Sequence, residues 1–374
     1  MDDFDKEKTR RLLSWYQGKK QGPFKIDIEL HRRCNLDCLS CSRRADEKFG
    51  KINEFSKTIE MPVEKWMSIV DQAAALGVWE WHIAGGGDPP YLKEVLFPVM
   101  KRIKEHNMYG ILTTNGTNLN EEDLKEIVKM GWDRIHFSID GPDAETHDYL
   151  RQVPGTFAKA TGNIARLSEL KKEFKTDKPM LNMNTVLSKK NYDKLDKQVE
   201  LAHKLGVEYM FIEPLIIYSK LGEELKLGET ERKKLAKTMK KVIKLTKKYK
   251  IDSNFANIDK NLNDELVAKS SAMHEVVKKD SDEYEQGTLL ATPCFDPWFH
   301  MTIKVNGRTI SCDVATDEGD NIQNKTLEEI WYGFYFEKQR KALMSGNVPD
   351  FCAQCNPSHT TQRRRLRKVI ENLS

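Results

Sequence analysis

The sequence predicts an α/β protein in which a parallel sheet is followed by a small α+β domain. Between residues 24 and 215, six short β-rich runs alternate with longer segments of helical periodicity. Repeated βα units of this kind build a parallel sheet, either open or curled into a barrel. Farther along the chain, Asn306-Gly307 separates two apolar runs and marks a β-hairpin.

The elements follow in order along the chain. Helical periodicity is clearest at 63–77 and 121–131, and each of these segments closes with a glycine, which is favoured just beyond a helix C-terminus. A further helical stretch, 326–346, precedes the last two cysteines. We expect the six strands within 24–30, 79–85, 109–115, 134–140, 181–187 and 208–214. The expected domains are an N-terminal helical extension (1–23), the barrel (24–215), a charged helical linker (216–290), the α+β domain (291–360) and a basic C-terminal helix (361–374).

The segment 216–290 is rich in Lys, Glu, Asp and Asn and contains no strand-like run. Four apolar residues repeat at helical spacing beneath a face of lysines, and they are Leu235, Met239, Val242 and Ile243. This pattern predicts a solvated amphipathic helix that links two domains. The basic residues of 361–374 are interpreted as solubilising surface.

Composition limits the classes of function. The chain has 374 residues and a net charge of only +4, which argues against a nucleic-acid partner. No apolar run reaches the roughly 20 residues that cross a bilayer, and the first residues lack the apolar core of a signal peptide. We therefore expect a cytoplasmic protein with no membrane partner. In a reducing compartment its seven cysteines are better interpreted as metal ligands or nucleophiles than as disulfides.

The first cysteine group is Cys34, Cys38 and Cys41, a CxxxCxxC pattern directly after the first predicted strand. Three thiolates on one loop can hold a 4Fe–4S cluster and leave one iron open for another ligand, because such a cluster normally takes four cysteines. The alternative is a structural zinc knuckle, which needs a fourth ligand such as His31.

This loop resembles that of the radical S-adenosylmethionine (SAM) superfamily, in which CxxxCxxC follows the first strand of a partial (β/α)6 TIM-like barrel. The resemblance covers roughly residues 24–215, and it implies that SAM binds the open iron of a catalytic 4Fe–4S cluster. Members usually carry an aromatic residue before the third cysteine, where this chain has Ser40. That departure concerns packing against the SAM adenine.

Other strand ends extend the resemblance. The family's GGEP motif, which receives the amino group of SAM, has its counterpart in Gly85, Gly86, Gly87, Asp88 and Pro89. Working residues of such barrels gather at the C-terminal ends of strands. Further candidate SAM contacts are Thr113, Thr114, Asn115, Ser138, Asp140 and Asn184, with Arg151 on similar grounds. The general base is left open among His82, His136 and Arg151.

The second cysteine group is Cys294, Cys312, Cys352 and Cys355. The first pair brackets the hairpin and the second pair is a tight turn, so the four thiols suit a closed site for zinc or for a fully ligated iron–sulfur cluster. A hairpin, a helix and a terminal CxxC look like the twitch domain, the short form of the SPASM domain. This resemblance implies one auxiliary 4Fe–4S cluster.

The two groups use all seven cysteines, so no thiol is left to return a hydrogen atom to a substrate radical. The resemblance then implies that SAM yields a 5′-deoxyadenosyl radical, with flavodoxin or ferredoxin as electron donor. We expect the two-electron oxidation of a small molecule such as a sugar or cyclitol, with the auxiliary cluster as electron acceptor. Only 23 residues precede the first strand, too few for a peptide-recognition domain. The alternatives are a peptide maturase that forms a crosslink, an epimerase with a tyrosine hydrogen donor, and a zinc-stabilised scaffold that is not an enzyme.

Overall fold

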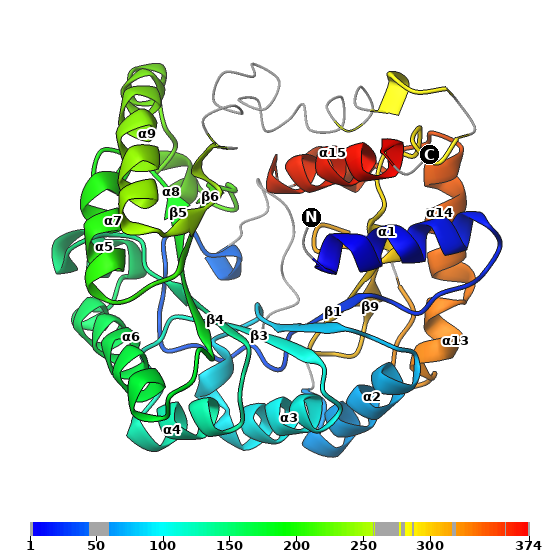
Figure 1. Cartoon of the computed structure of the whole chain (residues 1–374), viewed down its shortest axis with the longest axis horizontal. Helices are drawn as coiled ribbons and strands as arrows, with labels where there is room; N and C mark the ends of the chain where they lie inside the picture. Colours follow the sequence, from blue (N-terminus) through cyan, green and yellow to red (C-terminus); the bar gives the residue numbers. More distant parts are fainter. Residues whose placement is uncertain are drawn as a thin grey trace. The chain divides into compact units, whose positions relative to one another are not determined.

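The computed structural model describes residues 3–44, 60–256, 258, 277, 281–285, 288–315, 319–355 and 357–372 (Figure 1). The chain divides into two compact units. Unit 1 comprises Met1–Ile28, Met61–His82 and Asn263–Ser374, and unit 2 comprises Glu29–Glu60 and Ile83–Leu262. The domain boundaries expected from the sequence remain predictions.

Unit 2 is a parallel sheet with helices on one side. Its strand order is β7-β6-β5-β4-β3, and every pair in it is parallel. The strands are β3 (Tyr109–Thr114), β4 (Arg134–Ser138), β5 (Met180–Leu187), β6 (Tyr209–Pro214) and β7 (Asp252–Ser253). The helices are α3 (Lys93–Glu105), α4 (Glu121–Lys129), α5 (Ala144–Arg151), α6 (Thr156–Glu173), α7 (Leu195–Lys204), α8 (Lys220–Glu224) and α9 (Glu229–Tyr249).

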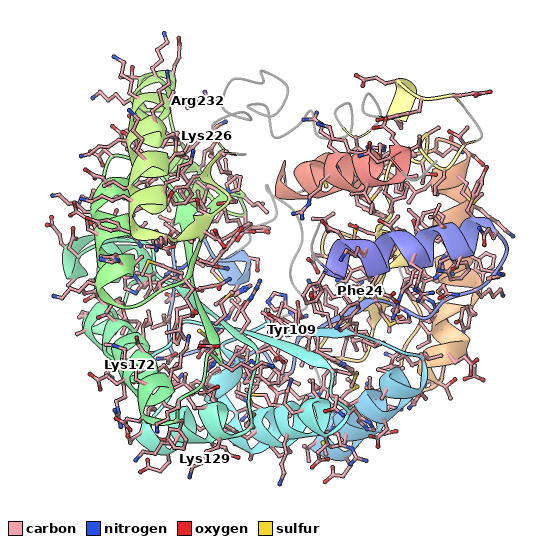
Figure 2. All side chains as sticks on the ribbon, viewed as in Figure 1. Phe24, Tyr109, Lys129, Lys172, Lys226 and Arg232 are labelled. Carbon is pink, nitrogen blue, oxygen red and sulfur yellow. The ribbon has the colours of Figure 1, made fainter. Side chains whose placement is uncertain are left out.

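The strands of unit 2 bury one face against these helices. Along β4, Ile135 and Phe137 are fully buried, whereas Arg134, His136 and Ser138 alternate with them and are half-buried. Because side chains alternate across a strand, the apolar set faces the helices and the polar set faces the opposite side of the sheet. Figure 2 shows Lys129 and Lys172 on the outer side of α4 and α6, away from the strands.

Strand β7 was not expected, and the expectation that 216–290 lacks a strand is wrong at Asp252–Ser253. These two residues pair in parallel with Tyr209 and Met210 of β6. Helix α9 is amphipathic as expected, but it connects β6 to β7 as one more βα unit of unit 2. The short strand escaped notice because two residues carry no periodicity.

Unit 1 carries the N-terminal strands and the C-terminal third of the chain. Its strand order is β2-β1-β8-β9, with β1 parallel to β8 and β8 antiparallel to β9. The strands are β1 (Lys25–Ile28), β2 (Glu80–Ile83), β8 (His300–Ile303) and β9 (Thr309–Ile310). The helices are α1 (Asp3–Tyr16), α2 (Val63–Ala75), α13 (Leu327–Trp331), α14 (Phe334–Met344) and α15 (Pro357–Glu371).

The core of unit 1 joins the two ends of the chain. Leu12 of α1, Phe24 before β1 and Ile370 of α15 lie in one buried cluster with residues 294–299. Helices α1 and α15 lie side by side (Figure 1). An ion pair of 2.5 Å joins Asp5 to Arg365. The C-terminal helix is thus part of the packed core of this unit.

Several elements predicted from local sequence patterns are present in the structure. All six predicted strands are present as β1 to β6. The glycines expected after two helices, Gly77 and Gly131, have φ values of 71° and 67°, the left-handed conformation that closes a helix without steric strain in glycine. The predicted hairpin turns at Gly307, whose φ is 83°. Among the described residues, no helix has the length and apolar content needed to span a bilayer.

Candidate functional site

The three cysteines of the loop after β1 belong to unit 2 and are half-buried. The backbone N–H of Leu36 donates to Sγ of Cys34 at 3.4 Å, and the N–H of Cys41 donates to the carbonyl of Cys38 at 3.2 Å. Burial raises the pKa of both Cys34 and Cys38, and each thiol also interacts electrostatically with Cys41. Three neighbouring thiols of this kind fit a metal centre, which binds them as thiolates.

The cysteine loop is anchored on the C-terminus of α5. The N–H of Leu39 donates to the carbonyl of Leu150 at 3.0 Å, and the N–H of Asp37 donates to the carbonyl of Arg151 at 3.4 Å. These carbonyls lie in the last turn of the helix, where no helical N–H reaches them. Leu39 and Leu150 also share a small apolar cluster with Leu225. The loop therefore completes the end of α5 and is held by it.

The glycines of the GGGDP segment allow two backbones to touch. A Cβ at Gly86 would lie 2.5 Å from the carbonyl oxygen of His31, and one at Gly87 would lie 2.0 Å from that of Arg33. The N–H of Asp88 donates to the same Arg33 oxygen at 2.9 Å. Gly86 and Gly87 therefore let the GGGDP segment approach the backbone that leads into the cysteine loop.

His31 is not available as a metal ligand. Its Nδ1 accepts a hydrogen bond from the N–H of Arg33 at 3.1 Å, and its Nε2 lies 3.1 Å from the carbonyl oxygen of Pro89. Both ring nitrogens are therefore engaged, and the side chain is buried. The zinc-knuckle alternative needed this residue as its fourth ligand, so the structure argues against that alternative.

Asp88 is a buried carboxylate whose two oxygens differ in their hydrogen bonds to the described residues. Its Oδ1 accepts hydrogen bonds from the hydroxyl of Thr114 at 2.9 Å and from the N–H of Asn115 at 2.7 Å. Its Oδ2 is buried and has no hydrogen-bond partner among the described residues. Burial raises the pKa of Asp88 to about 6, although the two donors to Oδ1 lower it. An unsatisfied carboxylate oxygen of this kind fits a cationic donor such as an ammonium group.

Asn115 links the end of β3 to the cysteine loop. Its Nδ2 donates to Oδ1 of Asn35 at 3.0 Å and lies 3.9 Å from Sγ of Cys34. Asn118 donates to the same Asn35 oxygen at 2.9 Å. Asn35 and Asn118 were not identified from the sequence, where an asparagine inside a metal loop resembles any turn residue.

Arg151 lies between Asp140 and Cys38. Its Nη2 is 2.8 Å from Oδ2 of Asp140, and its Nη1 is 3.6 Å from Sγ of Cys38. Burial opposes the charge, but Asp140 and Cys38 together raise the pKa of Arg151. A guanidinium held in this way does not accept a proton, so the structure corrects the suggestion that Arg151 is a general base. Its Nε is buried without a hydrogen-bond partner among the described residues and can donate to an anionic ligand.

The other predicted residues of unit 2 lie on adjacent strands. Ser138 and Asn184 are register partners on β4 and β5, and Oδ1 of Asn184 is buried without a partner in the described part of the chain. His136 lies two residues before Ser138 on β4, with its Nδ1 3.5 Å from the hydroxyl of Thr113. The structure thus brings these strand-end groups together on the polar side of one sheet.

His82 belongs to unit 1, where it joins an ionic network that the sequence analysis missed. Its Nδ1 is 3.5 Å from Oδ1 of Asp27, and the ammonium of Lys25 is 3.0 Å from the same oxygen. Nε2 of His300 is 3.0 Å from Oδ2 of Asp27. Burial opposes ionisation of Asp27, but Lys25 and His300 hold its pKa well below the usual range.

Ligand atoms of Asp27, His300 and Asp313 lie within 4.8 Å of one another, a spacing that a metal ion could bridge. Lys25 already pairs with Asp27, however, and the hydroxyl of Thr302 donates to Asp313 at 2.9 Å. We therefore interpret the group as a charge-paired polar network rather than a metal site.

The second cysteine group lies in unit 1. Cys294, Cys352 and Cys355 are buried, and Cys312 is half-buried. The N–H of Cys355 donates to the carbonyl of Cys352 at 3.1 Å, so the CxxC segment forms a tight turn. Burial raises the pKa of Cys294 and Cys312, and the charges of Cys355 and Cys294, respectively, add to this effect. Buried thiols that interact in this way fit a fully ligated cluster.

Comparisons with known proteins agree with these two sites. The radical SAM superfamily model matches residues 28–196, and the SPASM model, an iron–sulfur cluster-binding domain, matches residues 294–356. The AdoMet-dependent heme synthase of Methanosarcina barkeri is 30% identical over 49% of this chain and 48% of its own length. The chain therefore spans about half the length of that relative. The PqqA peptide cyclase of Ruegeria pomeroyi is 24% identical over 89% of this chain and 80% of its own length.

Solved structures share the fold. Streptococcus suis SuiB bound to S-adenosylmethionine has a TM-score of 0.63 at 15% identity, covering 88% of this chain and 71% of SuiB. SuiB bound to the precursor peptide SuiA has the same score and identity over 89% and 70%. This likeness confirms the predicted α/β class with a mostly parallel open sheet, as in a partial TIM barrel. The two family matches show a radical SAM domain over residues 28–196 and a SPASM domain over residues 294–356, and these two domains imply a catalytic 4Fe–4S cluster, SAM and an auxiliary cluster.

Proposed function

We propose that this chain is a radical SAM enzyme that modifies a peptide by joining two of its side chains. The observation that carries the proposal is the similarity to the PqqA peptide cyclase of Ruegeria pomeroyi, which extends over 89% of the chain and so well beyond the radical SAM segment. The small-molecule oxidation expected from the sequence becomes the second candidate.

We assign the catalytic cluster to Cys34, Cys38 and Cys41. The loop that carries them is held on both sides, by the C-terminus of α5 and by the glycine segment, and these contacts restrain the backbone that positions the three thiols. When bound, the cluster and SAM supply the 5′-deoxyadenosyl radical. The part played by the chain is to hold the reacting groups and to exclude competing reactions.

For SAM, each proposed contact rests on a buried polar atom that has no hydrogen-bond partner within the described part of the chain. Oδ2 of Asp88 would accept a hydrogen bond from the amino group, and Nε of Arg151 would donate to the carboxylate. Oδ1 of Asn184 would accept from a hydroxyl, with Ser138 beside it. Asp140 is already engaged, since its Oδ1 accepts from the N–H of residue 186 at 2.9 Å and its Oδ2 pairs with Arg151, so we assign it to positioning.

The auxiliary cluster, which we assign to Cys294, Cys312, Cys352 and Cys355, completes the balance of the reaction. A crosslink removes two hydrogens from the peptide: one leaves as an atom and converts the 5′-deoxyadenosyl radical to 5′-deoxyadenosine, and the other leaves as one electron and one proton. The auxiliary cluster, when bound, would supply the acceptor for the electron, and a basic side chain would take the proton. No cysteine remains outside the two groups to return a hydrogen atom, which favours oxidation over epimerisation.

The direct test follows the abstracted hydrogen atom. Anaerobically reconstituted protein with dithionite and SAM is incubated with a perdeuterated peptide library or with deuterated sugars and cyclitols. We expect deuterium in 5′-deoxyadenosine with the peptides alone, together with a peptide product that has lost two hydrogens. Transfer only from the sugars or cyclitols would favour the second candidate and reject the first.

The Cys38→Ala variant serves as the control for that experiment, because a missing ligand should abolish SAM cleavage altogether. Zinc without acid-labile sulfide in the anaerobic protein would reject both enzymatic proposals. Reconstituted protein should instead contain about eight irons if both clusters are of the 4Fe–4S type.

A further inference from the structure

Helix α15 lies outside the segment matched by the SPASM model, which ends at residue 356. Its basic residues were expected on the surface, but Arg363 and Arg367 are buried, with exposed fractions of 4% and 1%. A buried guanidinium is costly unless it is hydrogen-bonded and paired with negative charge. The partners of these two arginines therefore indicate what the helix does.

Arg367 holds the backbone that leads into Cys294. Its Nε donates to the carbonyl of Leu290 at 3.0 Å, and its Nη2 donates to the carbonyl of Thr292 at 2.7 Å. The guanidinium also lies 5.5 Å from the ring centre of Phe295. Arg367 thus contacts the backbone before Cys294 and the residue after it, and these contacts help to position the Cys294 thiol.

Arg363 faces the thiols themselves. Its Nη1 donates to Sγ of Cys355 at 3.5 Å. A guanidinium keeps its charge in proteins, so a buried cation lies against a ligand sulfur.

We propose that α15 is part of the auxiliary cluster site and that Arg363 raises the reduction potential of that cluster. The proposal rests on the ligand set assigned above. Reduction adds one negative charge to the cluster, and a guanidinium bonded to a ligand sulfur stabilises the reduced state more than the oxidised one. Cluster potentials respond to local charge and to hydrogen bonds on the sulfurs.

The role suits the chemistry, because an acceptor must take one electron from the product radical. In that step the radical loses one electron and one proton, and the auxiliary cluster is reduced by one electron. A cation bonded to a ligand thiolate favours this transfer. Arg363 is accordingly a positioning and tuning residue, and it takes no proton in the reaction.

The test measures the midpoint potential of the auxiliary cluster by redox titration monitored by electron paramagnetic resonance. The background carries alanine at all three catalytic ligands (Cys34, Cys38 and Cys41), so that only the auxiliary cluster is titrated. We expect Arg363→Gln to lower the potential by at least a tenfold change in the reduction equilibrium, about 59 mV for one electron. Lys368→Gln, an exposed charge change on the same helix, should leave it unchanged.

Two comparisons keep the outcome decisive. Arg363→Lys retains the charge, so its potential should lie nearer to that of the parent than that of Arg363→Gln does. If the glutamine variant loses iron, Arg363→Met, which also removes the charge, takes its place. If the variant that removes the charge does not differ from Lys368→Gln at full iron content, the inference is wrong and the ligand assignment stands. If Cys355→Ala keeps all of its auxiliary iron, the ligand assignment itself is wrong.

Discussion

Substitution of Gly87 by alanine tests whether the glycine segment must touch the cysteine loop. The added Cβ would lie 2.0 Å from the carbonyl oxygen of Arg33 and 2.7 Å from its backbone nitrogen. Non-bonded heavy atoms separate to about 3.5 Å at contact, so the two backbones must part by about 1.5 Å. Arg33 precedes Cys34, and the displacement therefore reaches a proposed cluster ligand. A shift of about 1 Å can lower a rate about 100-fold.

We expect Gly87→Ala to form 5′-deoxyadenosine about 100-fold more slowly and to lose about 1–3 kcal/mol of stability from overpacking. The assay is an anaerobic single-turnover measurement with excess dithionite, at matched iron content. Gly162→Ala is the matched control, because it lies within α6 and an added Cβ meets nothing within 4 Å. Alanine there should stabilise the helix by about 0.5–1 kcal/mol without changing the rate. A wild-type rate for Gly87→Ala at full iron content would refute the reasoning.

Three further predictions follow from the same geometry. Because the pKa of Asp88 is raised to about 6, the affinity for SAM measured by calorimetry should fall about tenfold for each pH unit below 6. Asp88→Asn should bind SAM weakly at every pH, and an affinity that still depends on pH in this variant would assign the effect to another group. Cys352→Ala should lose about half the iron and should still cleave SAM, but it should form no crosslinked product, whereas Cys38→Ala should not cleave SAM. Crosslinked product from Cys352→Ala would exclude the auxiliary cluster as the electron acceptor. Burial opposes protonation of His300, but Asp27 raises its pKa above 6.5. The stabilisation of the fold by protonated His300 is therefore complete below pH 6.5 and is lost as the pH rises through the raised pKa, and His300→Gln should remove this pH dependence of the melting temperature.

The strands and the helix ends could be predicted because their signals are local. Gly77 and Gly131 end helices through a backbone conformation that glycine alone adopts cheaply, whatever packs around them. The CxxxCxxC loop and the residues after each strand could be named for a similar reason, since their order follows the repeated βα unit. What the sequence could not show is which groups the fold leaves unsatisfied, such as Oδ2 of Asp88.

The expectation that the basic residues of 361–374 form solubilising surface is wrong at Arg363 and Arg367, which are buried. Arg363 and Arg367 occur in a run of basic residues, and a run of that kind is usually solvated surface. Their spacing of four places both on one face of α15, however, and the apolar Ile370 lies three residues farther along that face. The helix therefore buries a mixed face, which a search for apolar periodicity alone does not detect.

The alternation of polar and apolar residues along β1 and β4 indicates which face of each strand is packed against helices. Parallel strands covered by helices on both faces are apolar throughout, yet β1 alternates Lys25 and Asp27 with buried isoleucines, and β4 alternates Arg134 and His136 with buried apolar residues. Strict alternation in a parallel strand means that only one face is packed against helices. The other face must meet ionic partners or a ligand, because a buried charge without a partner is too costly to keep. In unit 1 that face holds the network around Asp27, and in unit 2 it holds the strand ends beside the proposed SAM contacts, so alternation alone marks the functional side of each strand set.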